Sequence, residues 1–238
     1  SKVIILFSAT FLVPLSLSWM LDDGAQLAYD EAILITFTAG MLIWLLTRKA
    51  QRELQTRDGF LLVLLTWTTL PAFATLPLLI YLPELSFTDA YFETVSGITT
   101  TGSTILSGLD ALPMSINLWR GLLVWFGGMG MIVLAVAILP LLGVGGMQMY
   151  KAETPGPMKD SKLTPRITET AKGLYLVYVG ISLACGTAYW LAGMTPFDSV
   201  MHTFTTMGLG GFSSHDASFG HWNSPLIESV AVAFMLVA

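Results

Sequence analysis

The chain has 238 residues, of which 54% are hydrophobic and only 11% are charged, with a mean hydropathy of +0.69. Soluble domains carry roughly 25% charged residues, so this composition excludes an ordinary soluble protein and predicts an integral membrane protein. The net charge of −5 offers no basic face for nucleic acid, and the single cysteine, Cys185, excludes a disulfide framework.

Apolar segments follow one another along the whole chain. They lie at about 3–21, 27–46, 60–82, 121–147 and 173–194, and from Leu226 to the end. We expect helices, because a chain in lipid must satisfy its own backbone hydrogen bonds and the sequence shows no alternating barrel pattern. The first segment is too long for a signal peptide and is interpreted as an anchor. The last is too short to span a bilayer, which predicts a chain cut within a helix.

The basic residues predict the topology. Only Arg120 lies outside three groups: Lys2; Arg48, Lys49, Arg52 and Arg57; and Lys151, Lys159, Lys162, Arg166 and Lys172. The positive-inside rule places these groups, and so the N-terminus, in the cytoplasm. The stretches 83–120 and 195–225 then lie on the outer side, and their acidic character attracts cations.

The two outer stretches form an internal repeat. A shift of 109 residues lays SFTDAYFETVSGITTTGST (86–104) over TPFDSVMHTFTTMGLGGFS (195–213). It aligns Asp89 with Asp198, Thr94 with Thr203, Ser96 with Thr205, Ile98 with Met207 and Gly102 with Gly211. The predicted unit is a helix, a half-buried re-entrant stretch and a second helix, present twice in the same orientation.

Each outer stretch is expected to begin as a short helix. Ser86-x-x-Asp89 and Thr195-x-x-Asp198 resemble capping boxes, and Pro196 fits the first helical position. About eleven residues precede each Thr/Gly run, too few to cross a bilayer, so the chain must return. Glycine permits the backbone angles of such a return. Backbone carbonyls in the returning segment can replace the hydration shell of an alkali cation.

Four runs carry a resemblance to a known family: FETVSGITTTGST, WFGGMGMIVLAVAILPLLGVGGMQMYKAETPGP, KLTPRITETAK and GLGGFSSHDAS. They resemble the bacterial TrkH potassium-uptake proteins of the Trk/Ktr/HKT superfamily, over essentially the whole chain. The resemblance implies an all-α, channel-like transporter of the bacterial inner membrane, with K⁺ as the transported ion. It implies two extra helices, then four membrane–pore–membrane repeats around one pore, with pore loops facing the periplasm. It also implies a homodimer and a cytosolic nucleotide-binding gating ring, TrkA.

The resemblance divides the chain, as the N-terminal half of such a protein, at its cytoplasmic connections. The expected parts are two extra helices (1–47), a cytoplasmic loop (48–56), the first repeat (57–150), a cytoplasmic linker (151–165) and a second repeat truncated in its last helix (166–238). The third repeat, which carries the family's intramembrane gating loop, is then absent from this chain.

The family's filter positions fall on two runs of this sequence. They are Thr99, Thr100, Thr101 and Gly102 in the first repeat, and Gly208, Leu209, Gly210 and Gly211 in the second. These residues are expected to bind K⁺. Leu209 departs from the small hydroxyl residue that is commoner there. The aromatic residue between two glycines of potassium channels is also absent, so looser selectivity that partly admits Na⁺ or Rb⁺ is expected.

Other polar and glycine-rich features have plainer interpretations. The glycine runs at 127–130 and 143–146 lack the preceding strand and following Gly-Lys-Ser/Thr of a phosphate loop, so they predict close helix packing. His202, His215 and His221 show no metal-ligand spacing. They are expected to be satisfied or solvated, with no transition-metal site.

Two acidic residues lie beside the proposed filters, and one connection carries many charges. Glu93 and Asp216 either set the local field or, as we favour, bond to neighbouring backbone. The basic stretch 150–172 either contacts a regulatory subunit or only sets topology.

Two classes of function compete. One is a cation permeation pathway, and the other is a membrane-embedded scaffold or regulatory subunit whose re-entrant hairpins only pack. An enzyme is not expected, because no nucleophile–base pair, metal cluster or phosphate loop can be assembled from the sequence.

Overall fold

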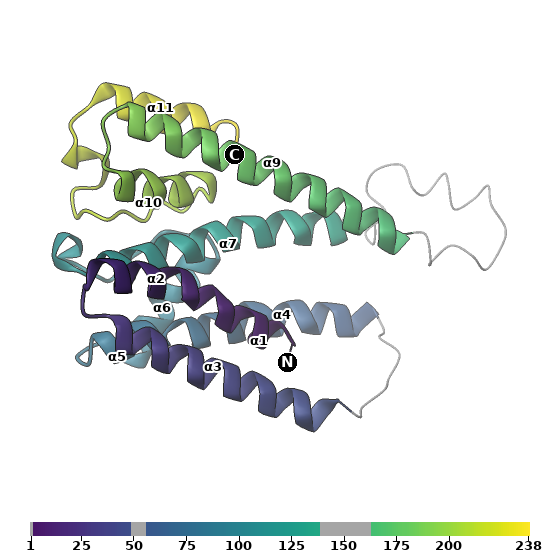
Figure 1. Ribbon diagram of the computed structural model, residues 1–238. Helices are drawn as coiled ribbons and strands as arrows, with labels where there is room; N and C mark the ends of the chain where they lie inside the picture. Colours follow the sequence, from purple (N-terminus) through teal and green to yellow (C-terminus); the bar gives the residue numbers. More distant parts are fainter. Residues whose placement is uncertain (1, 49–55, 139–162) are drawn as a thin grey trace, which may run out of the picture.

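The computed structural model describes residues 2–48, 56–138 and 163–238, and within these ranges it contains helices and turns but no strand (Figure 1). The elements of the first part are α1 (Lys2–Ser8), η1 (Ala9–Phe11), α2 (Leu12–Leu21), α3 (Gln26–Thr47), α4 (Thr56–Ala74), α5 (Leu76–Tyr81), α6 (Phe87–Ile98), η2 (Leu109–Ala111) and α7 (Met114–Ile138). The elements of the second part are α9 (Leu163–Leu191), α10 (Pro196–Met207), η3 (Ser218–His221) and α11 (Pro225–Met235). The expected all-α class is confirmed.

Four helical spans in the described part of the chain are long and apolar enough to cross a membrane. They are Lys2–Leu21, Gln26–Thr47, Phe60–Tyr81 and Glu169–Leu191 among the residues searched. Many of their large apolar side chains are exposed, as Leu46 and Leu176 are. Exposed apolar surface on this scale suits lipid rather than water. The chain is therefore a membrane protein, as its composition predicted.

Helix α7 begins earlier than the sequence suggested. The apolar segment was expected at 121–147, after an outer stretch ending at Arg120, but α7 begins at Met114, directly after Pro113. Arg120 therefore lies inside the helix, where its side chain is fully buried. A buried ion partner, described below, allows this charge within the helix. The part of the segment beyond Ile138, with Gly143, Gly145 and Gly146, lies outside the described residues.

The other segments differ from expectation mainly at their ends. The segment expected at 60–82 is two helices, α4 and α5, which meet at Thr75 between Pro71 and Pro77. Helix α9 begins at Leu163, ten residues before the apolar run that starts at 173. Its first turns are made of mainly polar residues. Helix α11 is 11 residues long, too short to span.

Helix α7 runs through the middle of the molecule and organises its core (Figure 1). Trp119 is fully buried against Phe11 and donates from Nε1 to the Ala74 carbonyl at 3.0 Å. One turn earlier, the Ser115 carbonyl accepts a 2.9 Å hydrogen bond from the Tyr29 hydroxyl. These contacts pack the N-terminal helices and the first repeat on a single central helix.

The described helix ends that flank the two positively charged connections lie at one end of the molecule. Helices α3 and α7 end there and α4 and α9 begin there (right of Figure 1), whereas the turns before α6 and α10 lie at the opposite end. The two outer stretches of the sequence thus share one side, as the topology prediction requires. Lys49, Arg52, Lys151, Lys159 and Lys162 themselves lie outside the described residues.

Candidate functional site

Two short helices, α6 and α10, carry the site and begin with the same cap. In each, the hydroxyl of the first capping residue accepts from a backbone N–H at 3.1 Å and donates to the carboxylate of the same partner at 2.7 Å. The pairs are Ser86 with Asp89 and Thr195 with Asp198. Both helices are 12 residues long, roughly 18 Å, so neither crosses a bilayer. The predicted capped half-helices are confirmed.

The segments after the two helices share an unusual backbone. The angle φ is 56° at both Thr100 and Leu209, and it is 74° at Gly102 and 83° at Gly211. The shift of 109 residues pairs these positions. A positive φ is rare outside glycine, so its occurrence at two equivalent non-glycine residues is strong support for the internal repeat.

The first amides of each loop fold back onto the helix before it. The paired bonds are Thr100 N to Gly97 O (2.9 Å) and Leu209 N to Thr206 O (3.1 Å), then Thr101 N to Ser96 O (2.8 Å) and Gly210 N to Thr205 O (3.0 Å). Among the described residues, none of the carbonyl oxygens at 99–102 or 208–211 accepts a hydrogen bond from an N–H or O–H group. Two equivalent rows of carbonyls therefore have no partner among the described residues, which leaves them available to a cation.

The two loops contact each other and α7 through glycines. A β-carbon on Gly102 would lie 1.4 Å from the carbonyl oxygen of Gly210, so the loops approach at backbone distance. A β-carbon on Gly127 would lie 2.0 Å from the Ile98 carbonyl oxygen, and one on Gly128 would lie 3.1 Å from Gly208 Cα. The expected packing role of the 127–130 glycines is confirmed, and Gly127 and Gly128 pack against the C-terminal ends of α6 and α10.

The threonine side chains act partly within their own turn. The Thr99 hydroxyl donates to the Val95 carbonyl at 2.7 Å and lies 2.8 Å from the Thr101 hydroxyl. Leu209, the departure from the family pattern, has a side chain that is 54% exposed. Its side chain is thus not packed behind the loop.

A buried ion pair lies behind the first loop. Arg120 Nε donates to Glu93 Oε1 at 2.8 Å, and both side chains are 1% exposed. The Arg120 guanidinium also stacks over the Phe212 ring, 4.5 Å from its centroid. We expected Glu93 to bond mainly to backbone. It does accept from Ile105 N at 3.1 Å, but its partner in the ion pair is the arginine that sequence reasoning set aside.

Arg120 joins the two loops just beyond residues 99–102 and 208–211. Its Nη2 donates to Thr104 Oγ1 at 3.1 Å in the first repeat, and its Nη1 donates to the Ser213 carbonyl at 3.1 Å in the second. The Thr104 hydroxyl donates in turn to the Glu93 carboxylate at 2.9 Å. One buried ion pair therefore contacts the segments that follow both loops. In the sequence, the feature that could have indicated this ion pair was a single arginine at the start of an apolar segment.

The histidines and Asp216 lie in the outer part of the second repeat. His202 is buried and fully bonded, with Nδ1 2.9 Å from the Asp198 carbonyl and Nε2 3.0 Å from Ser213 Oγ, as a satisfied histidine should be. Asp216 accepts from Gly108 N (3.0 Å) and Leu109 N (3.1 Å), so it bonds to backbone as favoured, but in the other repeat. His215 and His221 stack on each other.

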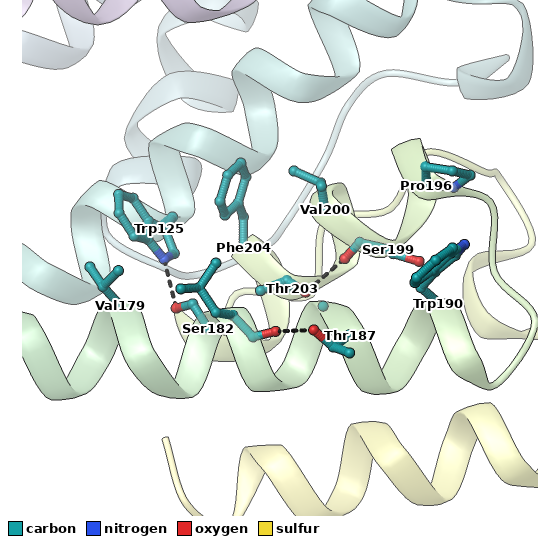
Figure 2. Close-up of a pocket in the computed structure, with 12 residues that line it drawn as sticks. Trp125, Val179, Ser182, Thr187, Trp190, Pro196, Ser199, Val200, Thr203 and Phe204 are labelled. Atoms are coloured by element: carbon teal, nitrogen blue, oxygen red, sulfur yellow. Dashed lines mark hydrogen bonds between the residues drawn. The ribbon is translucent and has the colours of Figure 1, made fainter.

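An open groove of about 510 Å³ lies beside α10, between that helix and α9 (Figure 2). Figure 2 shows Trp125 of α7 at one end and Trp190 of α9 at the other. The hydroxyls in it bond within the protein: Ser182 accepts from Trp125 Nε1 at 3.1 Å, and Thr203 donates to the Ser199 carbonyl at 2.7 Å. The groove is apolar and directs no hydroxyl at a ligand, so the site is the loops.

Comparison with known proteins identifies the family of the chain. The family model TrkH, described as a cation transport protein, matches residues 27–238. The chain belongs to the TrkH family. TrkH relatives named "Trk system potassium uptake protein TrkH" from Vibrio parahaemolyticus and Escherichia coli are each 50% identical, over 98% and 99% of this chain and 48% and 49% of their own length. The crystal structure titled as the potassium transporter TrkH from Vibrio parahaemolyticus matches with a TM-score of 0.86 at 46% identity, over 99% of this chain and 47% of that one.

The chain thus spans about half the length of the TrkH proteins that it matches. The resemblance seen in the sequence is confirmed at the level of the family. Membership makes the chain part of a family described as cation transport proteins.

Proposed function

We propose that this chain supplies two pore loops of a potassium-uptake transporter, and that residues 99–102 and 208–211 select K⁺ through their backbone carbonyls. The observation that carries the proposal is the pair of equivalent loops whose carbonyl oxygens accept no hydrogen bond from the part of the chain that the structure describes. The relatives' names, which specify potassium uptake, support K⁺ as the ion.

The chemistry of selection follows from the loops and the helices before them. Carbonyl oxygens in a row replace the hydration shell of K⁺, and no fixed charge is needed in the filter. Helices α6 and α10 both end at the loops, so their partly negative C-termini favour a cation there. The glycines let two backbones approach, and the small threonines leave the carbonyls accessible. The two loops would form half of a fourfold filter.

The proposed setting is the bacterial inner membrane, with the N-terminus in the cytoplasm and the loops on the periplasmic side. Support comes from the basic residues of the connections 48–56 and 151–165 and from the turns before α6 and α10, which lie at the opposite end of the molecule from the helix ends that flank these connections (Figure 1). The divisions 1–47, 57–150 and 166–238 are proposed as the extra helices and two pore repeats.

We propose a homodimer that works with a cytosolic gating ring of the TrkA type rather than catalysing a reaction. The relatives are named as parts of a Trk system, and the basic stretch 150–172 is the proposed contact. The competing scaffold function predicts no ion path through these loops.

The test is ⁸⁶Rb⁺ uptake into vesicles that contain the full-length transporter carrying these residues, with Na⁺ as competitor. Wild type should take up Rb⁺, and Na⁺ should compete weakly. Gly102→Ser should change the K⁺/Na⁺ preference, because its side chain would collide with the Gly210 carbonyl. Selective uptake that Gly102→Ser and Gly211→Ser leave unaltered, at normal membrane levels, would contradict the filter assignment and favour the scaffold.

A further inference from the structure

Three metal-ligating side chains meet on the outer loops, away from the filter carbonyls. Asp110 of η2 belongs to the first repeat, and His215 and His221 belong to the second. One ligand atom from each lies within 4.8 Å of the other two. The side chain of Asp110 is 50% exposed and that of His215 is 17% exposed, so the cluster opens to the outer solution.

Contacts with neighbouring groups already orient the side chains of Asp110 and His215. His215 Nδ1 contacts Asp110 Oδ1, and Asp110 Oδ2 accepts from Asp216 N at 3.1 Å. On the other side of the ring, His215 Nε2 lies 3.3 Å from Asp198 Oδ1, without the alignment of a hydrogen bond. A metal-binding histidine characteristically directs its second ring nitrogen at a carboxylate, which fixes the tautomer and the ring. Asp198 is in the position for that role.

The third ligand is an exposed ring that is able to turn. The His221 ring stacks on His215 with centroids 3.6 Å apart and planes 5° apart, and Trp222 packs edge-on against both. Parallel rings do not aim their lone pairs at one point. Metal binding therefore requires His221 to rotate and the donor atoms to come to about 3.4 Å from one another, the separation set by tetrahedral Zn–N bonds of about 2.05 Å. The close contact between His215 Nδ1 and Asp110 Oδ1 must open to this separation as the ion enters.

We propose that Asp110, His215 and His221 form a Zn²⁺ site that joins the outer loops of the two repeats. Two imidazoles and one carboxylate suit Zn²⁺ and disfavour Mg²⁺ and Ca²⁺, which prefer oxygen ligands. Three protein ligands leave a fourth position for water. The bound ion cross-links η2 to the loop after the second filter, and so stiffens the outer loops. Binding does not depend on the transport function proposed above.

The experiment measures Zn²⁺ binding to the purified, chelator-washed full-length transporter in detergent, by isothermal titration calorimetry. Two variants remove exposed ligands, Asp110→Asn and His221→Gln. Glu84→Gln is the control, because it removes an exposed acidic charge from the same outer side without touching the cluster. Comparing variants with wild type separates this site from any other metal site of the protein. His215 is left intact because it also faces Asp198.

We expect one Zn²⁺ in the wild type and the control that is absent, or bound at least about tenfold more weakly, in both variants. Zn²⁺ should also raise the Tm of wild type and control but not of the variants, because only the folded loops bring the ligands together. Mg²⁺ should do neither. Equal Zn²⁺ binding by wild type and His221→Gln, or no binding by wild type, would show a plain Asp–His contact and overturn the proposal. If Asp110→Asn fails to fold, His221→Gln carries the test, since its exposed ring makes only ring contacts.

Discussion

Glu93 of α6 and His202 of α10 occupy equivalent positions, 109 residues apart, and each contacts a hydroxyl beyond the last glycine of the proposed filter in its own repeat. Thr104 donates to Glu93 at 2.9 Å, and Ser213 Oγ lies 3.0 Å from His202 Nε2. The shift of 109 residues also pairs Thr104 with Ser213. The contact between helix and loop therefore has the same geometry in both repeats, but its chemistry differs. The first repeat uses a glutamate that is paired with Arg120, and the second uses a histidine.

Neutralising Glu93 should be costly. In Glu93→Gln, Arg120 keeps a buried charge without a counter-charge. Removing one partner of a buried ion pair lowers the free energy of unfolding by about 3–5 kcal/mol. We expect a lower Tm and weaker discrimination between K⁺ and Na⁺, because Arg120 contacts the segments that follow both loops. Thermal unfolding in detergent and Na⁺-competed ⁸⁶Rb⁺ uptake measure the two effects. Glu84→Gln, an exposed glutamate on the same side, is the control, and equal Tm values for the two variants would argue against the role of the pair.

Three glycines of positive φ should respond differently to serine. Gly24, Gly102 and Gly211 have φ of 82°, 74° and 83°, so each substitution costs roughly 1–2 kcal/mol in backbone strain. Only Gly102 also meets a backbone atom, and nothing lies within 4 Å of the other two. Gly102→Ser should reduce transport most, Gly211→Ser should mainly alter ion preference, and Gly24→Ser should affect stability alone. A change of ion preference in Gly24→Ser would show that strain, not the filter, is responsible.

Asp23 should make the packing of the N-terminal helices sensitive to acid. Partial burial raises the pKa of its carboxyl, but hydrogen bonds from Ser18, Ser115 and Ala25 outweigh this and hold the pKa below the ordinary 3.8. A lowered pKa gives stabilisation that is complete above about pH 4 and is lost as the pH falls through the folded-state value. The Tm of Asp23→Asn should be several degrees below wild type at pH 7, and the gap should narrow toward pH 3. A gap independent of pH would contradict this, and Asp22→Asn, at an exposed neighbour, is the control.

The single cysteine offers a test of orientation. Cys185 is fully buried in α9, so a membrane-impermeant maleimide should not label the wild type. Gly24→Cys should be labelled from the outer side, and Pro157→Cys only after the membrane is opened. Replacing the basic residues at 48–57 should disturb this pattern more than it changes ion preference. Labelling of Pro157→Cys in intact cells would reverse the proposed topology.

Much of the local structure was predictable because its causes lie close together in the chain. The caps at Ser86 and Thr195 depend on a partner three positions away, and the return of the chain depends on Gly102 and Gly211. The boundary of α7 was wrong because a charge normally ends an apolar segment. Arg120 does not, since Glu93, from another helix, compensates it.

The sequence by itself determined the membrane class, the family and the two short capped helices with their glycine turns, since composition, capping and positive φ are properties of a few neighbouring residues. Only the tertiary structure decided that Gly102 meets Gly210, that Arg120 braces both loops, and that Asp110 meets His215 and His221. These contacts join residues far apart in the chain. Their geometry arises when α7 packs the two repeats together, and no local pattern records it.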